Sequence, residues 1–387
     1  MTAQAFPRDP LPPVPPKPLS VSQRGRSGME ILGSMQKLAS GVLRQHAAET
    51  FFANEKAAEL NKVHIADKKP EKSVLRERIA EAKAICESDS IYRLERLVQR
   101  YVAEENYNRG IPAIEERREM FEPFVNSEAT PAEGATLELN PELSEPKYWS
   151  STEWHLEPGG WEGYDLYPAV FAFTIGPKVF SLGGYAAVGV GDKIQEQRYQ
   201  VALQFPKESY QRIYEPGCGG FSTLGAVHRV FPEAELHGSD LSPSLLKGCY
   251  KMAGALGVPV HLKRTDSTKT GEADSSFDGV ITYALHHEMP PKENKALFAE
   301  MFRILKPGGD IVISDPPPFR AVDLFHAVIL DWDTDHREEP FFSATGESVL
   351  EDMLTEVGFE NAEAYTIGSQ GSYPWVTRAR KPEAALN

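Results

Sequence analysis

The chain has 387 residues, of which 41 % are hydrophobic and 25 % charged, and its formal net charge is −15. This composition is typical of a globular protein with a sizeable core, and the length fits one large or two moderate domains. The acidic balance argues against nucleic acid or an anionic membrane surface as a partner, because both require clustered lysine and arginine. Three cysteines without a CxxC spacing exclude a disulfide framework and a cysteine-rich zinc site, which fits a cytoplasmic protein.

The first half of the chain divides into three regions. Residues 1–28 are a proline-rich tail that we expect to be disordered, and they lack the apolar core of a signal peptide. Residues 29–124 repeat apolar residues three and four positions apart, which predicts a helical N-terminal domain and offers helices for a homo-oligomer. Residues 125–199 are read as a linker and then an aromatic lid segment, which contains Trp149, Trp154 and Trp161. Its apolar runs stay well short of the ~20 residues of a membrane-spanning helix.

From residue 200 to 387, short apolar strands alternate with helices. The expected strands contain RIYEP, AELHGSD, VPVHLKR, FDGVITY and DIVISD, with helical patterns between them. A further helix and two more strands follow at the C-terminal end. This βαβ alternation predicts a parallel sheet with helices on both faces.

The loop EPGCGG (215–220) follows the first of these strands. It is not a P-loop, because no lysine follows the glycines, and it matches only the first two glycines of the GxGxxG dinucleotide fingerprint. Glu215 at the end of the strand would repel a pyrophosphate but would pair with a cationic amine. S-adenosylmethionine (SAM) has an ammonium and a sulfonium and no phosphate. The negative charge of Glu215 therefore favours SAM as the ligand. A nicotinamide dinucleotide is the alternative ligand.

The segments EPGCGG, GSDLS, TDS, SSFDGVITYALHH and RILKPGGDIVISD resemble those of class I SAM-dependent methyltransferases, in the ubiquinone/menaquinone C-methyltransferase-like branch. The resemblance covers residues 200–378 and implies SAM as cofactor and a seven-stranded Rossmann-like sheet that ends in a hairpin. The glycine loop would line the methionine end of SAM, Asp240 would hold the ribose, and Asp266 would face the adenine. Phe221, where the family often has a third glycine, leaves the path of the loop open. The residues that this resemblance assigns to SAM binding are Glu215, Gly217, Cys218, Gly219, Asp240, Leu241, Thr265, Asp266, Ser267 and Tyr283.

The candidate catalytic residues are His286, His287 and Glu288, which end the fourth strand. Methyl transfer depends first on holding the nucleophile against the methyl group, and a base is also needed if the acceptor must lose a proton. Alternation along an extended chain would place His286 and Glu288 on one face, where the carboxylate could orient the imidazole as a general base. His287 would then point to the other face. The alternative is that a histidine here only packs near the cofactor.

Three other polar segments receive a structural interpretation. SDPPPF (314–319) resembles the signature of amino-methylating enzymes, but it follows the fifth strand instead of the fourth, so we interpret it as a strand end. DWDTDHREE (331–339) begins like a calcium loop, but His336 replaces the required glycine, so we expect a solvated acidic loop and predict no metal site. His155 and Glu157, within the lid segment, are expected at the surface.

Together these observations predict a cytoplasmic SAM-dependent methyltransferase. Its acceptor is expected to be a small apolar or aromatic molecule, methylated at carbon or oxygen, because aromatic lid residues would suit such a molecule. The alternatives are an N-methyltransferase of a small molecule and a catalytically silent SAM-fold interaction subunit. The complete set of Glu215, Asp240 and Asp266 argues against the silent subunit.

Overall fold

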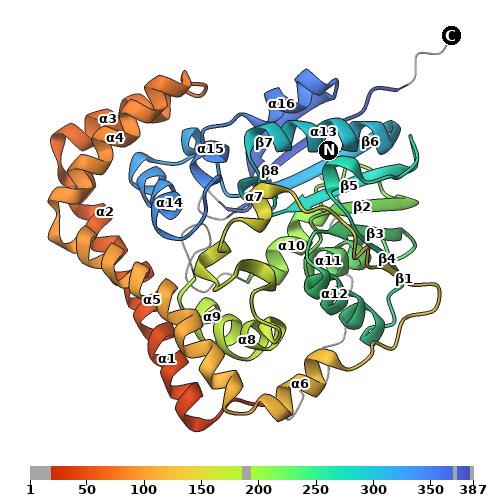
Figure 1. Cartoon of the computed structure of the whole chain (residues 1–387). Coiled ribbons are helices and arrows are strands. Elements are labelled where there is room, and N and C mark those ends of the chain that lie inside the picture. Colours follow the sequence, from red (N-terminus) through yellow and green to blue (C-terminus); the bar gives the residue numbers. More distant parts are fainter. Residues whose placement is uncertain (1–18, 185–192, 369–372, 384–387) are drawn as a thin grey trace.

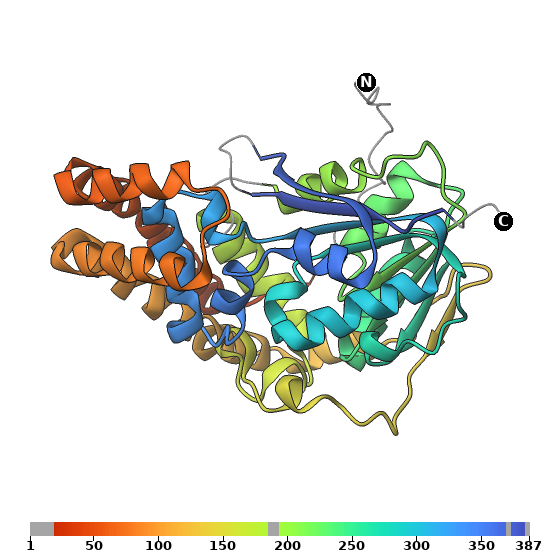
Figure 2. The same ribbon diagram turned by 90° about the horizontal axis from the view of Figure 1, so that it is seen from above.

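The computed structural model describes residues 19–184, 193–368 and 373–383. Figures 1 and 2 show an arm of N-terminal helices beside an α/β body, with α14 (Leu324–His336) lying against the arm. Most of the expected proline-rich tail, residues 1–18, lies outside the described residues. Within the described ranges, no helix is both long and apolar enough to cross a bilayer.

The N-terminal arm consists of helices whose starts and buried faces follow from the sequence. Asp89 caps α5, because its carboxylate accepts hydrogen bonds from the backbone N–H groups of Ile91 and Tyr92. In α4 the buried residues are spaced three or four apart, as an amphipathic helix requires. The elements are α1 (Gln23–Leu38), a π-helical turn η1 (Ala39–Leu43), α2 (Arg44–Ala53), α3 (Glu55–Ala66), α4 (Lys72–Ser88), α5 (Ser90–Glu115) and α6 (Arg118–Asn126).

The arm and the body share a hydrophobic core. Phe51 and Leu75 of the arm are buried in one cluster with Phe325 and Val328 of α14. His64 is fully buried, and its Nε2 lies 3.1 and 2.9 Å from the carbonyl oxygens of Phe319 and Val322. This continuous packing holds the arm against the body, and the domain limits proposed from the sequence stay predictions.

The segment between the arm and the body is made of short turns of helix. We call residues 147–184 the lid segment. A short strand, β1 (Thr136–Glu138), lies before it, in the stretch read as a linker, and pairs with β4. The lid elements are α7 (Lys147–Ser150), η2 (Trp154–Leu156), η3 (Gly160–Glu162), α8 (Tyr167–Val170), the π-helix η4 (Phe171–Phe180) and α9 (Ser181–Gly183).

The body is an α/β sandwich around one sheet, which confirms the predicted fold class. The described strands form an eight-stranded sheet in the order β1-β4-β3-β2-β5-β6-β8-β7, so β1 adds one strand to the seven expected. Only β8 runs antiparallel to its neighbours, in the expected hairpin with β7. The strands are β2 (Arg212–Pro216), β3 (Glu235–Asp240), β4 (Val260–Arg264), β5 (Phe277–Tyr283), β6 (Leu305–Asp315), β7 (Glu360–Thr366) and β8 (Trp375–Arg380).

Helices cover both faces of the sheet because consecutive strand residues point to opposite sides. Ile213 belongs to the core under α10, α11 and α12, whereas Tyr214 belongs to the core under α13 and α16. Because β4, β3, β2, β5 and β6 run parallel, their carboxyl ends lie along one edge of the sheet, and the lid segment contacts this edge where His155 meets Glu288. The helices are α10 (Ile194–Ala202), α11 (Ser222–Val230), α12 (Pro243–Ala255), α13 (Pro291–Ile304), α15 (Phe342–Gly346) and α16 (Leu350–Val357), with 3-10 turns η5 (Ser267–Lys269), η6 (His286–Glu288) and η7 (Phe319–Ala321).

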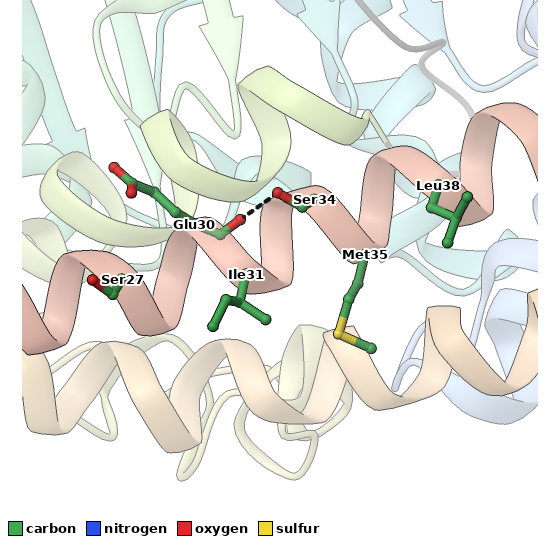
Figure 3. Close-up of a pocket in the computed structure, with 6 residues that line it drawn as sticks. All are labelled: Ser27, Glu30, Ile31, Ser34, Met35 and Leu38. Carbon is green, nitrogen blue, oxygen red and sulfur yellow. Dashed lines mark hydrogen bonds between the residues drawn. The ribbon is translucent and has the colours of Figure 1, made fainter.

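A hollow of about 460 Å³ lies on the surface of α1, and all its lining residues come from that helix (Figure 3). Ile31 and Leu38 are half-exposed there, and Glu30 supplies the one charged side chain. This hollow lacks the converging polar groups of a catalytic site. The site must be sought at the carboxyl edge of the sheet.

Candidate functional site

The glycine loop leaves β2 with a backbone that favours glycine. Gly217 and Gly219 have φ of 62° and 49°, in the left-handed region. A Cβ at Gly217 would lie 2.5 Å from Leu285 Cδ1, whereas a Cβ at Gly219 would meet no atom within 4 Å. The loop therefore packs closely at one glycine and faces open space at the other, which leaves room for a ligand.

Glu215 lies beneath this loop, inside the protein. Its side chain is buried, and its Oε2 has no hydrogen-bond partner among the described residues. Burial raises the pKa of Glu215 well above its usual value, and the nearby Thr223 and Arg198 counteract this only in part. A buried carboxylate with an unpaired oxygen fits a cationic ligand, because such a ligand would replace the lost hydration.

Arg198 of α10 is a site residue that the sequence reasoning missed. Its guanidinium lies 4.2 Å from the centroid of the Tyr283 ring, and its Nε donates to Thr223 Oγ1 at 3.3 Å. It is thus a cation held beside Glu215 and the glycine loop. Since α10 precedes the first strand of the recognised motif, no motif spacing could indicate it.

Asp240 is the last residue of β3, and Asp266 lies two residues after the end of β4. Asp240 accepts hydrogen bonds from the N–H groups of Gly219 and Ser242, both at 2.8 Å, which ties it to the loop. Burial raises the pKa of Asp240 to about 6. Asp266 accepts from the N–H of Thr268 at 2.9 Å and caps η5. Each carboxylate keeps lone pairs for further donors, so both can also hold ligand hydroxyl or amino groups.

The other residues assigned to SAM binding lie near these acids, but some of them present backbone groups there instead of side chains. The Cys218 side chain is buried in the core, so only its backbone faces the loop. Leu241 accepts a hydrogen bond from Arg264 through its carbonyl, and the Thr265 N–H donates to the carbonyl of Asp240. Ser267 Oγ lies 2.9 Å from Ser239 Oγ.

The two histidines after β5 have different environments, and the predicted pairing of His286 with Glu288 is wrong. The segment turns as a 3-10 helix, so residues do not alternate there as in a strand. His286 is fully buried between Thr282 and Asn294: its Nδ1 donates to Asn294 Oδ1 at 2.7 Å, and its Nε2 lies 3.0 Å from Thr282 Oγ1. With both ring nitrogens engaged, His286 is part of the core.

His287 instead forms a pair with Asp315. Its Nδ1 lies 2.7 Å from Asp315 Oδ1, and Asp315 also accepts from the backbone N–H groups of Leu285 and His286. Burial lowers the pKa of His287, but Asp315 outweighs it and raises the value to about 9. Asp315 belongs to SDPPPF, which the sequence reasoning interpreted only as a strand end. The parallel pairing of β5 with β6 brings the two segments together.

A second polar cluster, His155–Glu288–Glu339, joins three distant segments. His155 Nε2 lies 3.2 Å from Glu288 Oε1 and 2.8 Å from Glu339 Oε1. Burial lowers the pKa of His155, but the two carboxylates raise it well above its usual value. His155 and Leu156 have φ of 57° and 65°, an uncommon backbone conformation that often occurs at functional sites.

Two expectations about these segments are wrong. Glu157 is fully buried, not at the surface, and burial raises its pKa to about 9. Residues 331–336 form the last turns of α14, not a loop, and Asp333 is buried near Arg96 and Arg44. Only Glu339, which the sequence reasoning did not single out, turns toward the lid segment.

The lid segment brings aromatic side chains over this edge. Tyr148 and Trp154 lie with their ring centroids 5.9 and 6.1 Å from that of Phe341, and Trp161 lies 5.0 Å from His155. Burial raises the pKa of Tyr148, and the carboxylates of Asp266, Glu293, Asp240 and Glu288 add to the effect. The Tyr148 hydroxyl is therefore influenced both by acids assigned to SAM binding and by Glu288 after β5.

Glu162 ties the lid segment to the cofactor half. Its Oε1 accepts from Ser244 Oγ at 2.7 Å and from the Ser244 N–H at 3.3 Å, and also from Ser242 Oγ. These serines begin α12, directly after Asp240. The lid segment is thus anchored beside the proposed ribose site.

Comparison with known proteins identifies this part of the chain. A family model described as a methyltransferase domain matches residues 213–309. A demethylmenaquinone methyltransferase of Deinococcus radiodurans is 37 % identical over 40 % of this chain and 62 % of its own length. The corresponding enzyme of Thermus thermophilus is 34 % identical over 40 % of this chain and 69 % of its own. A Haemonchus contortus phosphoethanolamine N-methyltransferase 2 structure aligns at 17 % identity over 54 % of this chain and 55 % of that one, with a TM-score of 0.41.

Proposed function

The chain belongs to the class I SAM-dependent methyltransferases, and we propose that it methylates a small apolar or aromatic molecule at carbon or oxygen. SAM, the cofactor of the family, supplies an electrophilic methyl group when bound. What this chain contributes is the binding of that cofactor, the exclusion of water, and the placement and deprotonation of the acceptor.

The unpaired oxygen of the buried Glu215 is the observation that carries the cofactor assignment. A cationic amine is the group that such an oxygen needs. Arg198, beside it, would pair with the carboxylate of the methionine moiety, and Asp240 would take the ribose hydroxyls. Asp266 would accept from the adenine amino group. In support of this arrangement, Asp240 accepts from the N–H of Gly219 in the glycine loop, and Arg198 donates to Thr223, just after that loop.

The acceptor would lie between the cofactor and the lid segment. Aromatic rings approach this place from both sides: Trp161 contacts His155, and Phe342 lies 5.2 Å from His287. Such rings suit an apolar or aromatic molecule, which they would shield from water. These contacts support the acceptor class without identifying the molecule.

We propose His287 as the base, oriented by Asp315. With Nδ1–H directed at Asp315, the Nε2 atom of the neutral ring is the one that can take a proton from the acceptor. Because the pKa of His287 is about 9, His287 is protonated in most molecules at neutral pH. The fraction with a neutral imidazole, which is the form that can act as a base, therefore increases as pH rises. Nitrogen methylation is the second candidate, because the carboxylates of Glu288 and Glu339 would also attract an amine.

Labelled SAM, incubated with the purified chain and a metabolite extract, tests the proposal. One compound should gain a methyl group, and NMR of the product should locate it on carbon or oxygen. The same incubation with Asp240→Ala is the control and should label far less. A product methylated at nitrogen would favour the second candidate. Tight SAM binding with no labelled product in any extract would favour a silent subunit.

A further inference from the structure

We propose that His155, Glu288 and Glu339 bind one divalent transition-metal ion next to the His287–Asp315 pair. One ligand atom from each of the three side chains lies within 4.8 Å of the other two, which one ion can bridge. They come from η2 in the lid segment, from η6 after β5, and from the loop after α14. A bound ion would therefore join the lid segment to the carboxyl edge of the sheet. The proposal does not depend on the identity of the methyl acceptor.

The cluster contains more acceptors than its own donors can satisfy. Glu288 Oε2 and Glu339 Oε2 are both buried, and neither has a hydrogen-bond partner among the described residues. Glu339 as a whole is only 7 % exposed. In the described ranges, neither glutamate forms an ion pair with lysine or arginine, so His155 is the sole positive partner besides His287. A buried carboxylate oxygen without a hydrogen-bond donor destabilises the folded protein unless a cation pairs with it.

Glu157 gives an independent indication of a missing cation. It is fully buried, two residues from His155, and neither of its carboxylate oxygens has a partner among the described residues. The charge of His155 acts on this carboxyl group. A carboxyl group without any donor is rare in a protein core. A divalent ion at the cluster would supply a positive counter-charge for the Glu157 carboxylate.

The donor set also indicates which ion. One imidazole nitrogen with two carboxylates suits borderline metals such as Zn²⁺ or Mn²⁺, whereas Mg²⁺ and Ca²⁺ prefer oxygen alone. His287 stays outside this set: its Nδ1 is engaged by Asp315, and its Nε2, which lies 3.5 Å from Glu288 Oε1, is the atom proposed to take the acceptor proton.

A second cluster in the described part of the chain, Glu235–His237–His261, is a useful contrast. There Arg212 Nη2 lies 3.0 Å from His237 Nε2, so a guanidinium already provides the positive charge. Glu235 is also exposed to water. We therefore expect no ion at that cluster.

Metal binding to the full chain tests the proposal directly. The chain is stripped with a chelator and titrated with Zn²⁺ by calorimetry and with Mn²⁺ by electron paramagnetic resonance, without SAM. We expect one ion per chain. Glu339→Gln should weaken binding by roughly 10- to 100-fold, because it removes one anionic ligand. Glu338→Gln is the matched control: it removes the same charge from the adjacent, exposed residue and should leave the affinity within about twofold.

The outcomes separate this proposal from the methyltransferase assignment. If Glu339→Gln does not fold, as judged by its melting temperature, His155→Gln replaces it, with the same expected loss. Wild-type chain that takes up neither ion while still binding SAM overturns the metal proposal and leaves the methyltransferase assignment intact. Equal weakening in Glu338→Gln and Glu339→Gln also overturns it, because binding would then reflect general surface charge.

Discussion

The two halves of the site at the carboxyl edge are built in different ways. The cofactor half uses β2, β3 and β4, which follow one another in the sequence, and each acid lies within two residues of the end of its own strand. The acceptor half takes His155 from the lid segment, His287 from the turn after β5, Asp315 from the end of β6 and Glu339 from beyond α14. Local motifs therefore describe the first half, whereas only the folded chain assembles the second. The predictions below test whether the halves are also functionally separate.

The largest effect is expected for His287→Ala. If Nε2 takes the acceptor proton, kcat should fall by about 10²- to 10⁴-fold, the usual contribution of a general base. The dissociation constant of SAM should change by less than about threefold, because His287 belongs to the acceptor half. Steady-state kinetics and calorimetry on the same preparation provide both numbers. A variant with full kcat would mean that the chain acts by positioning alone.

Asp240→Ala, in contrast to His287→Ala, should mainly weaken the binding of SAM. It removes the proposed ribose acceptor and also the hydrogen bonds from Gly219 and Ser242. SAM affinity should fall by roughly 30- to 150-fold, about 2–3 kcal/mol, which is the upper range for one charge-assisted hydrogen bond. Glu339→Gln, in the acceptor half, is the control and should keep SAM affinity. Unchanged binding by Asp240→Ala would remove Asp240 from the cofactor site.

The pH dependence of turnover tests the His287–Asp315 pair. Because Asp315 raises the pKa of His287 to about 9, kcat should increase with pH and level off above that value. Asp315→Asn removes the charge that favours the imidazolium, so the rise should move to lower pH. Rate profiles of both proteins, recorded with saturating SAM, show the shift. Identical profiles would exclude His287 as the titrating base.

His286→Ala should affect stability instead of chemistry. The ring is fully buried and hydrogen-bonded at both nitrogens, so its removal takes the imidazole partner from Thr282 Oγ1 and Asn294 Oδ1. We expect a loss of about 1–3 kcal/mol in the free energy of unfolding. Measured well below the melting temperature, kcat should stay within about threefold of wild type, in contrast to His287→Ala. A folded variant with a loss of activity as large as that of His287→Ala would reverse the assignment of the two histidines.

Glu162→Gln should have the smallest effect. It weakens the link from the lid segment to Ser242 and Ser244 but leaves Asp240 in place. Because Glu162 is exposed, we expect only a two- to fivefold rise in the dissociation constant of SAM, about 0.4–1 kcal/mol. Calorimetric titration of the variant with SAM measures this dissociation constant. A change as large as that of Asp240→Ala would show that the lid segment is part of the cofactor site.

Most of the fold and the cofactor half could be predicted from the sequence. Strand and helix periods are local, and Glu215, Asp240 and Asp266 each directly precede a turn that the motif identifies. The stretch containing β1 could not be read as a strand, because three residues paired only at the sheet edge have too short a pattern.

The acceptor half could not be predicted for a physical reason. Which histidine faces Glu288 depends on whether residues 286–288 continue the strand or turn. In the folded chain they turn, and His286 packs against Phe298, a residue of α13 that is distant in sequence. Asp315 and Glu339 gain their roles from segments that approach only in the folded chain. For Asp315, the one available signal was an acid at the end of the strand next to the histidines.

Calorimetric titration of the full chain with SAM, and separately with NAD, tests the central claim most directly. The charge of Glu215 and the open glycine loop predict binding of SAM at micromolar concentration and no binding of NAD. Binding of NAD with no response to SAM would contradict the assignment, because the buried acid would then face a pyrophosphate that it should repel.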